Sequence, residues 1–306
     1  MPPAFTVLLT AWNLDPSILL GLLALGGGYV YLTGPLRERR GWSEHGPTSR
    51  QRTLYALALV TLALALITPL DALGDDYLFS AHMVQHMLLT VVFPPLFLLG
   101  LPGWLIRPAP RRPWASRVAR GLTLAPVAFA LFNADFWLWH LPALYDATLS
   151  NEALHIFEHV TFLATGLLNW MPIFSPVPDL LPRLPRPHQI LYLFLSCQPM
   201  VALGALFTFA SQPLYAPYVA APRLFGISAL TDQQLGGLIM WIPGSLVYLG
   251  VLSVIFFVWV ERHSAEEARR ADALLGFTDD MGAPAPDAPA TTSADGGATI
   301  ASEGSR

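Results

Sequence analysis

Residues 78–101 read LFSAHMVQHMLLTVVFPPLFLLGL, an apolar stretch without a single Asp, Glu, Lys or Arg. A helix needs about 20 such residues to cross the hydrocarbon layer of a bilayer, which is roughly 30 Å thick. The first half of the stretch nevertheless carries two histidines, His82 and His86. It therefore predicts a membrane-spanning helix that holds a pair of ionisable side chains.

Six further apolar blocks are spread along the chain, near residues 16–34, 54–70, 122–140, 153–174, 189–210 and 234–260. Composition agrees with them, because 54% of the residues are hydrophobic and only 12% are charged, about half the charged fraction of a soluble globular protein. Backbone groups in lipid must bond to one another, which favours helices, and the alternating pattern of a membrane strand is absent. We therefore predict an all-α, polytopic membrane protein with seven transmembrane helices.

The charge of the intervening loops alternates and predicts the orientation. Arginines gather in residues 35–53, 102–121 and 175–188, and again after the last block. The other loops are acidic or nearly free of basic residues, namely 71–77, 141–152 and 211–233. Because basic loops stay in the cytoplasm, we expect the amino end outside and the carboxyl end in the cytoplasm. The first 14 residues lack the basic region of a cleaved signal peptide.

Two domains are expected. Residues 1–263 form the transmembrane domain, with kinks at Pro94-Pro95, Pro199 and Pro243. Residues 264–306 form a cytoplasmic tail, in which a Glu/Arg-rich stretch extends the last helix by a few turns. Its remainder, from Met281, is rich in Ala, Pro, Gly, Ser and Thr and is expected to be disordered.

Five of the eight histidines fall near the predicted outer ends of the helices. His82 and His86 share one helix face because they are four residues apart, and so do His155 and His159. His140 closes the fourth block. Ionisable groups in a membrane helix are costly and usually face the bundle interior, and imidazole is the commonest biological metal ligand. We expect these five side chains to bind a metal, although an interfacial histidine bonded to water is a simpler interpretation of His140 or His155 alone.

Accessory residues lie close to the histidines in the sequence. Asp135 and Glu158 could orient the imidazoles, although a structural Asp135 bonded to Asn133 or Asn169 is equally compatible with the sequence. Soft sulfur ligands for copper are available from Met83, Met87 and Met240, and in the sixth block from Cys197 and Met200. Methionine is also a routine core residue, and Cys197 is more simply a small buried apolar residue.

Several segments resemble the CtaG-type cytochrome c oxidase assembly factors of bacteria, which are linked to caa-type oxidases. They are His82-Met83-Val84-Gln85-His86-Met87, Trp139-His140-Leu141-Pro142, His155-Ile156-Phe157-Glu158-His159 and the run DQQLGGLIMWIPG at residues 232–244. Their order covers most of residues 15–260. The resemblance implies seven membrane helices, an outer amino end and a role in making active haem-copper oxidase, for which copper delivery is the usual proposal.

We therefore expect a non-enzymatic assembly factor in the bacterial inner membrane that handles copper. Its expected partners are oxidase subunits or other copper chaperones and membrane lipid, with no nucleic acid. The alternatives are a cytochrome with haem b between His86 and His159, and a transporter of metal or small solutes. The run His155-x-x-Glu158-His159 also matches an inverted zinc-protease motif, but a protease would need a third ligand and a substrate cleft.

Overall fold

All seven predicted blocks are helical in the computed structural model, which describes residues 3–107 and 113–282 and contains no strand among them. The matching elements are α2 (Pro16–Thr33), α4 (Ser49–Leu66), α6 (Phe79–Met87) with η1 (Leu88–Val92) and α7 (Phe93–Gly100), α10 (Ala125–Trp139), α12 (Glu152–Phe174), α13 (Arg186–Thr208) and α15 (Ala229–Gly282). The apolar blocks thus predicted the helices correctly, to within a few residues at most ends.

Five helical segments are long and apolar enough to cross a membrane, as in a multi-pass membrane protein. The number rises to six if α9 (Pro113–Leu122) and α10, which are bent by 66° at their junction, form one span. The 23-residue α12 is not among them, because its histidines, carboxylates and amides lower its mean hydropathy. The polar residues that suggest a function are thus the ones that weaken the membrane signal of this helix.

Chain contacts divide the protein into two units, Met1–Trp259 and Val260–Arg306. In the second unit the helix α15 continues to Gly282, so the Glu/Arg-rich stretch does extend the last helix. The expectation of disorder from Met281 onward falls almost entirely on residues outside the described part of the chain.

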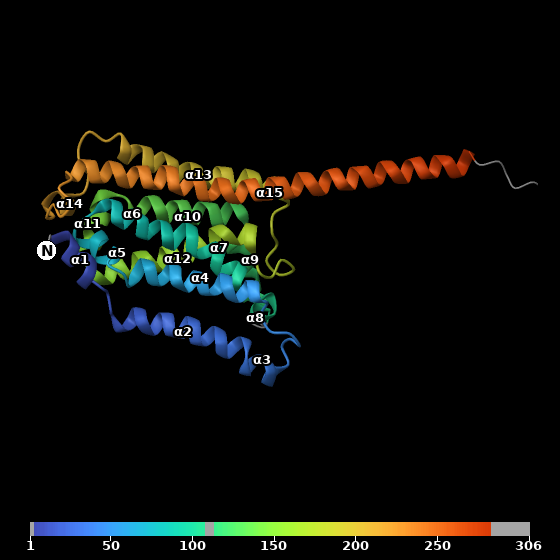
Figure 1. The fold of residues 1–306 in the computed structure, drawn as a ribbon, viewed down its shortest axis with the longest axis horizontal. Coiled ribbons are helices and arrows are strands. Elements are labelled where there is room, and N and C mark those ends of the chain that lie inside the picture. The colour runs from blue at the N-terminus through green and yellow to red at the C-terminus, as the bar shows by residue number, and fades with distance from the viewer. Residues whose placement is uncertain (1–2, 108–112, 283–306) are drawn as a thin grey trace, which may run out of the picture. The chain divides into compact units, whose positions relative to one another are not determined.

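Short helices occupy the loops of the first unit and gather at its two ends (Figure 1). One end holds α1 (Pro3–Thr10), α5 (Leu70–Asp76), α11 (Pro142–Ser150) and α14 (Ala216–Ala220). The opposite end holds the arginine-rich α3 (Pro35–Arg40), α8 (Gly103–Ile106) and α9. The acidic loops and the basic loops therefore lie at different ends of the bundle, as the alternation of charge predicts.

The third block is one helix with a widened π turn, η1, in its middle. Pro94 has no N–H, so it cannot bond to a carbonyl in the turn before it. The Thr90 carbonyl in that turn instead accepts a bond of 3.2 Å from the indole Nε1 of Trp170 on α12. Gly166, one turn earlier on α12, lets the two helices pack closely, since a Cβ there would lie 3.3 Å from the Cγ of Pro94. The carbonyl that Pro94 leaves without a helical partner thus joins this helix to α12 through a hydrogen bond.

The amino end of α6 is held by a residue that is far away in the sequence. Asp232, at the start of α15, is fully buried and accepts hydrogen bonds from the backbone N–H groups of Phe79 (2.7 Å) and Ser80 (3.2 Å). A carboxylate is favoured there because the first N–H groups of a helix have no partners within it. Gln85, on the next turn, donates to the Ala65 carbonyl and to Asp71. These contacts fix the height and rotation of the helix that carries His82 and His86.

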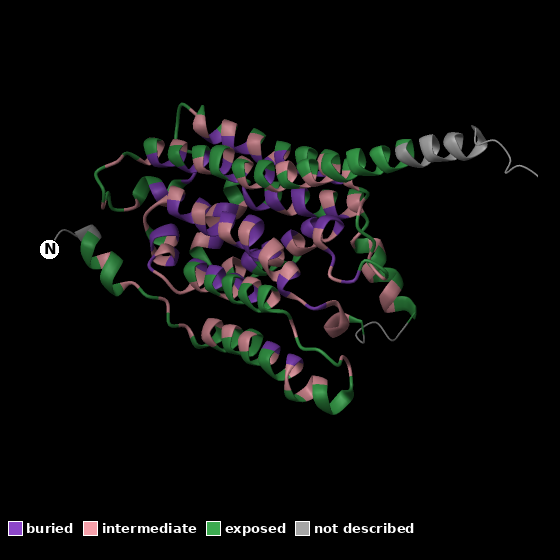
Figure 2. Ribbon diagram, turned by 45° about the vertical axis from the view of Figure 1, so that its right-hand side comes forward, coloured by how far each residue is buried: buried purple, intermediate pink, exposed green. Residues whose placement is uncertain are grey.

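The bundle core lies between α6, α10, α12, α13 and α15, and its buried residues form a continuous layer (Figure 2). Helices α13 and α15 touch backbone to backbone, because a Cβ on Gly237 would lie 2.5 Å from the Gly204 carbonyl oxygen. Pro199 and Pro243 lie inside these two helices, as predicted.

Candidate metal centre

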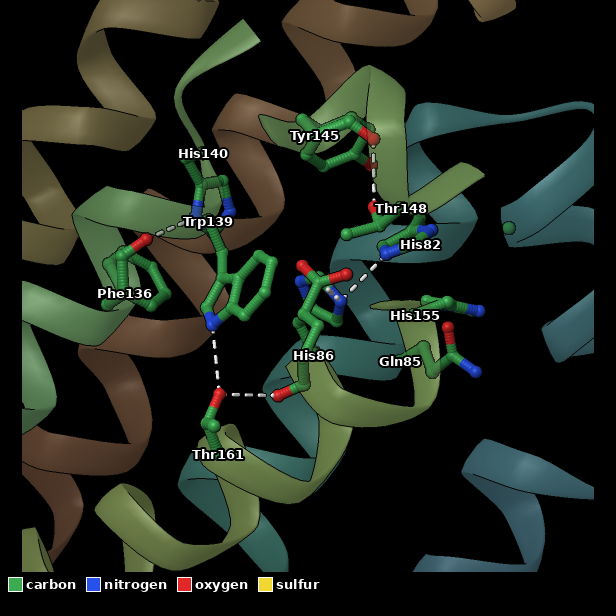
Figure 3. Close-up of polar contacts among 12 residues, drawn as sticks. His82, Gln85, His86, Phe136, Trp139, His140, Tyr145, Thr148, His155 and Thr161 are labelled. Carbon is green, nitrogen blue, oxygen red and sulfur yellow. Dashed lines mark hydrogen bonds and ion pairs between the residues drawn. The ribbon is translucent and has the colours of Figure 1, made fainter. Parts of the chain in front are cut away.

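The five histidines of the predicted site converge in the interior of the bundle. The ring centroid of His82 on α6 lies 5.5 Å from that of His155 on α12, and that of His86 lies 5.7 Å from that of His159. His140, which follows α10, lies 5.9 Å from His86. The two i,i+4 pairs therefore face each other, which the sequence could not establish; Figure 3 shows His82, His86, His140 and His155 of this cluster.

Two groups of side chains bring three potential ligand atoms within 4.8 Å of one another. The three-histidine group consists of His82, His155 and His159, and the histidine–glutamate group consists of His82, His86 and Glu158. His82 belongs to both. Because neutral imidazole and carboxylate are metal ligands, each group can supply three protein ligands to one cation.

Many polar atoms of these residues are buried and have no hydrogen-bond partner in the described protein. They are Nδ1 of His82 and His86, Nε2 of His140, His155 and His159, and both carboxylate oxygens of Glu158. The hydroxyl of Thr148, which lies close to these residues, donates to the Tyr145 carbonyl (Figure 3). A buried polar atom without a partner costs about 1–3 kcal/mol. Their concentration in one place fits a site for a cation.

The imidazoles of His82 and His86 contact each other directly. Their Nε2 atoms are 2.7 Å apart, so one ring donates a proton to the other (Figure 3). The Nε2 atom of His86 also lies 3.7 Å from Oε1 of Glu158. Only one of the two N–H protons of these neutral rings lies in this bond, so the donor ring keeps a lone pair on Nδ1 that is available to a metal.

Asp75 is part of the site, although in the sequence it is only one of the acidic residues of the 71–77 loop. Its two carboxylate oxygens each lie 3.5 Å from a histidine Nδ1, one on His82 and the other on His155. It thereby links α6 to α12 and can orient both rings, as a carboxylate often does for metal-bound histidine. The signal in the sequence was its position seven residues before His82, in the loop that leads into α6.

Asp135 does not touch a histidine, and it does not bond to Asn133 or Asn169 either. It accepts hydrogen bonds from Trp139 Nε1 (2.9 Å) and from the Thr165 hydroxyl (2.8 Å). The same indole also donates to Thr161, whose hydroxyl donates to the backbone carbonyl of Glu158 (Figure 3). Asp135 therefore supports the turn of α12 that carries Glu158, and its effect on the histidines is indirect.

The methionine and cysteine side chains lie in the core toward α13 and α15. Met83 packs where Gly236 approaches α6, and Met87 meets Met200 at Gly244. Met240 is buried in the same core cluster. Cys197 lies 3.4 Å from the Ser245 hydroxyl, and neither candidate ligand group among the described residues includes it. The ligand groups themselves thus offer nitrogen and oxygen.

A pocket of about 400 Å³ reaches the cluster from the end of the bundle where α5 lies. Four acidic residues line it, Asp15, Asp71, Asp75 and Glu152, together with His155 and His159. The hydroxyl and amide of Ser17 donate to Asp15 and lower the pKa of its carboxyl. Asp15 therefore contributes a negative charge to the lining of this pocket. His45 and His188 are exposed, and so is His263 in the second unit.

Comparison with known proteins agrees with the resemblance found in the sequence. Uncharacterized proteins of Mycobacterium bovis and Mycobacterium tuberculosis are each 29% identical over 89% of this chain, and one of Mycobacterium leprae is 28% identical over 91%. The chain spans less than half the length of these relatives, 43–44%. No solved structure matches it. The profile of the cytochrome c oxidase caa3 assembly factor family matches residues 27–262, and the chain belongs to this family.

Proposed function

We propose that this protein binds copper in its histidine cluster and delivers it to cytochrome c oxidase during assembly of the enzyme. The observation that carries the proposal is that five imidazoles and the carboxylates of Asp75 and Glu158 converge in one place. Many of their polar atoms are buried and lack hydrogen-bond partners. A family of oxidase assembly factors gives this site a plausible recipient. Copper is the cargo and not a resident cofactor, so no catalytic step is needed.

The proposal includes the predicted topology. We infer seven spans in the bacterial inner membrane, with α12 as a span whose polar face is turned inward, an outer amino end and a cytoplasmic carboxyl end. Support comes from the separation of acidic and basic loops at the two ends of the bundle. The histidines then lie near the outer boundary, where oxidase subunits or copper chaperones could exchange an ion with them.

The ligand chemistry bears on the kind of copper that is bound. Thioether and thiolate ligands select Cu(I), whereas imidazole and carboxylate also suit Cu(II) and Zn(II). Because the methionines pack toward α13 and α15, the cluster offers mainly borderline ligands. Moderate affinity is expected from such a set, as a carrier that must release its ion requires.

Haem is the alternative that a specific geometry argues against. A porphyrin between His86 and His159 would need a wide flat slot between the two helices. The ring of Phe162 instead lies 4.7 Å from that of His86, and the ring of His82 lies 4.2 Å from it. A transporter is disfavoured as well, since Leu89, Phe162 and Trp170, which follow the histidines along η1 and α12, are fully buried.

The test is the metal content and visible spectrum of protein purified from its own host. We expect about one copper per chain and no Soret band. His86→Ala and His159→Ala should leave the protein folded but abolish oxidase activity in the host, because each removes a ligand. His188→Ala, at an exposed position, is the matched control. Normal oxidase activity in both site variants would contradict the proposal, and a Soret band would favour the cytochrome.

A further inference from the structure

The two ligand groups differ in their access to the surface. In the three-histidine group, His155 is 13% exposed and its neighbour Asp75 is 29% exposed, and His155 and His159 line the acidic pocket. In the histidine–glutamate group, His86 is 2% exposed and Glu158 is fully buried. A cation arriving through the pocket therefore meets the three-histidine group first.

His82 presents one nitrogen to each side. Its Nδ1 faces Asp75, which also reaches His155, and its Nε2 faces His86, which also reaches Glu158. Imidazole binds metals through either nitrogen. A single ring can thus be a ligand in both groups, through a different nitrogen in each.

We propose that the two groups are successive positions of one copper ion, an entry position at the three-histidine group and a holding position at the histidine–glutamate group. The inference rests on the proposed function and adds a direction to it. The transfer is a ligand exchange without redox change, in which the bonds to His82 Nδ1, His155 and His159 break as bonds to His82 Nε2, His86 and Glu158 form. The proton between His82 and His86 moves to a ring Nδ1 as the ion takes its place.

The walls of the pocket support entry from that side. Four acidic residues line this concave, partly apolar pocket, and negative charge on its walls raises the local concentration of cations and speeds their association. Asp71 is held by Asn13 and Gln85, whereas Asp75 is directed at the two histidine Nδ1 atoms. The charge therefore increases the rate of loading, and the buried ligands determine the affinity.

The experiment uses the full-length protein in detergent, with Cu(I) supplied as its complex with a coloured chelator. The absorbance of the chelator reports both the loading rate and the equilibrium affinity. His155→Gln should slow loading by about tenfold or more and change the affinity little. Glu158→Gln should weaken the affinity by about tenfold to a hundredfold, in the range seen when a metal site loses a supporting group, and leave the loading rate unchanged. His82→Gln should impair both.

Asp76→Asn, an exposed neighbour of Asp75, is the control for charge, and His188→Gln is the control for histidine. Glu158→Asp replaces Glu158→Gln if that variant does not elute as a single species in size exclusion. Equal effects of His155→Gln and Glu158→Gln on rate and affinity would overturn the relay, and so would two copper ions bound per chain. In both cases copper handling would stand, whereas a wild-type protein that binds no copper would remove both proposals.

Discussion

Replacing Gly237 by alanine tests whether the close contact between α13 and α15 supports the site. The added Cβ would lie 2.5 Å from the Gly204 carbonyl oxygen and 2.7 Å from the Thr208 amide nitrogen, against 3.4 Å or more for an ordinary contact. Both atoms belong to the helix backbone, so neither can move away as the end of a flexible side chain would. The helices must therefore separate locally by almost the missing distance, about 1 Å, which forfeits roughly a quarter to a half of the dispersion energy at that contact.

The expected cost follows from this separation. Overpacking a well-packed core costs typically about 1–3 kcal/mol, and here it is partly offset by the gain of about 0.5–1 kcal/mol when alanine replaces glycine inside a helix. Gly250→Ala on the same helix is the matched control, because a Cβ there meets nothing within 4 Å. The propensity gain is common to both variants, so their difference isolates the clash.

The assay is the midpoint of heat-induced aggregation in detergent, followed by size exclusion, for the two variants and the wild type. We expect Gly237→Ala to have a lower midpoint than Gly250→Ala. Copper affinity should also fall in Gly237→Ala, because the adjacent Gly236 seats Met83 and Phe79 of the helix that carries His82. A Gly237→Ala protein as stable as Gly250→Ala would refute the close contact between the helices.

Two further variants test how α12 is held in place. Trp170→Phe removes the indole that donates to the Thr90 carbonyl. It should lower the free energy of unfolding by about 1–3 kcal/mol, since a buried carbonyl loses its partner. An unchanged midpoint of heat-induced aggregation would contradict a stabilising bond between α12 and η1. Asn151→Ala removes the side chain that accepts the Leu154 N–H at the start of α12; it should cost about 0.5–2 kcal/mol, measured in the same assay, and Asn151→Asp should restore most of the loss.

Helical blocks and face-sharing histidine pairs could be read from the residues because they depend on local spacing. An apolar run of about 20 residues forms a helix in lipid whatever its neighbours are, and side chains four residues apart share a face of any helix. Residue spacing therefore predicted α2, α13 and the pairing of His82 with His86 in advance. The predicted span at 153–174 is a helix as well, but its polar residues keep it outside the five segments that meet the length and apolarity criteria.

The accessory ligands were predicted less well, because the direction of a side chain depends on the rotation of its helix in the bundle. Asp135 was expected to orient a histidine or bond to an asparagine, and it bonds to Trp139 and Thr165 instead. Met83 and Met87 flank the histidines in sequence, yet their side chains pack against α13 and α15. Adjacent residues on a helix point about 100° apart, so residues next to the histidines in sequence can face other helices.

By itself the sequence determined the helical membrane architecture, the separation of charge between the ends and the two histidine pairs, since each depends on composition or on spacing within one segment. Only the tertiary structure decided that the pairs face each other, that they form two ligand groups sharing His82, one of them with Glu158, that Asp75 contacts His82 and His155, and that Asp232 anchors the helix carrying the first pair. These contacts join residues from separate helices. Their distances follow from how the helices pack and rotate, which no local pattern of residues specifies.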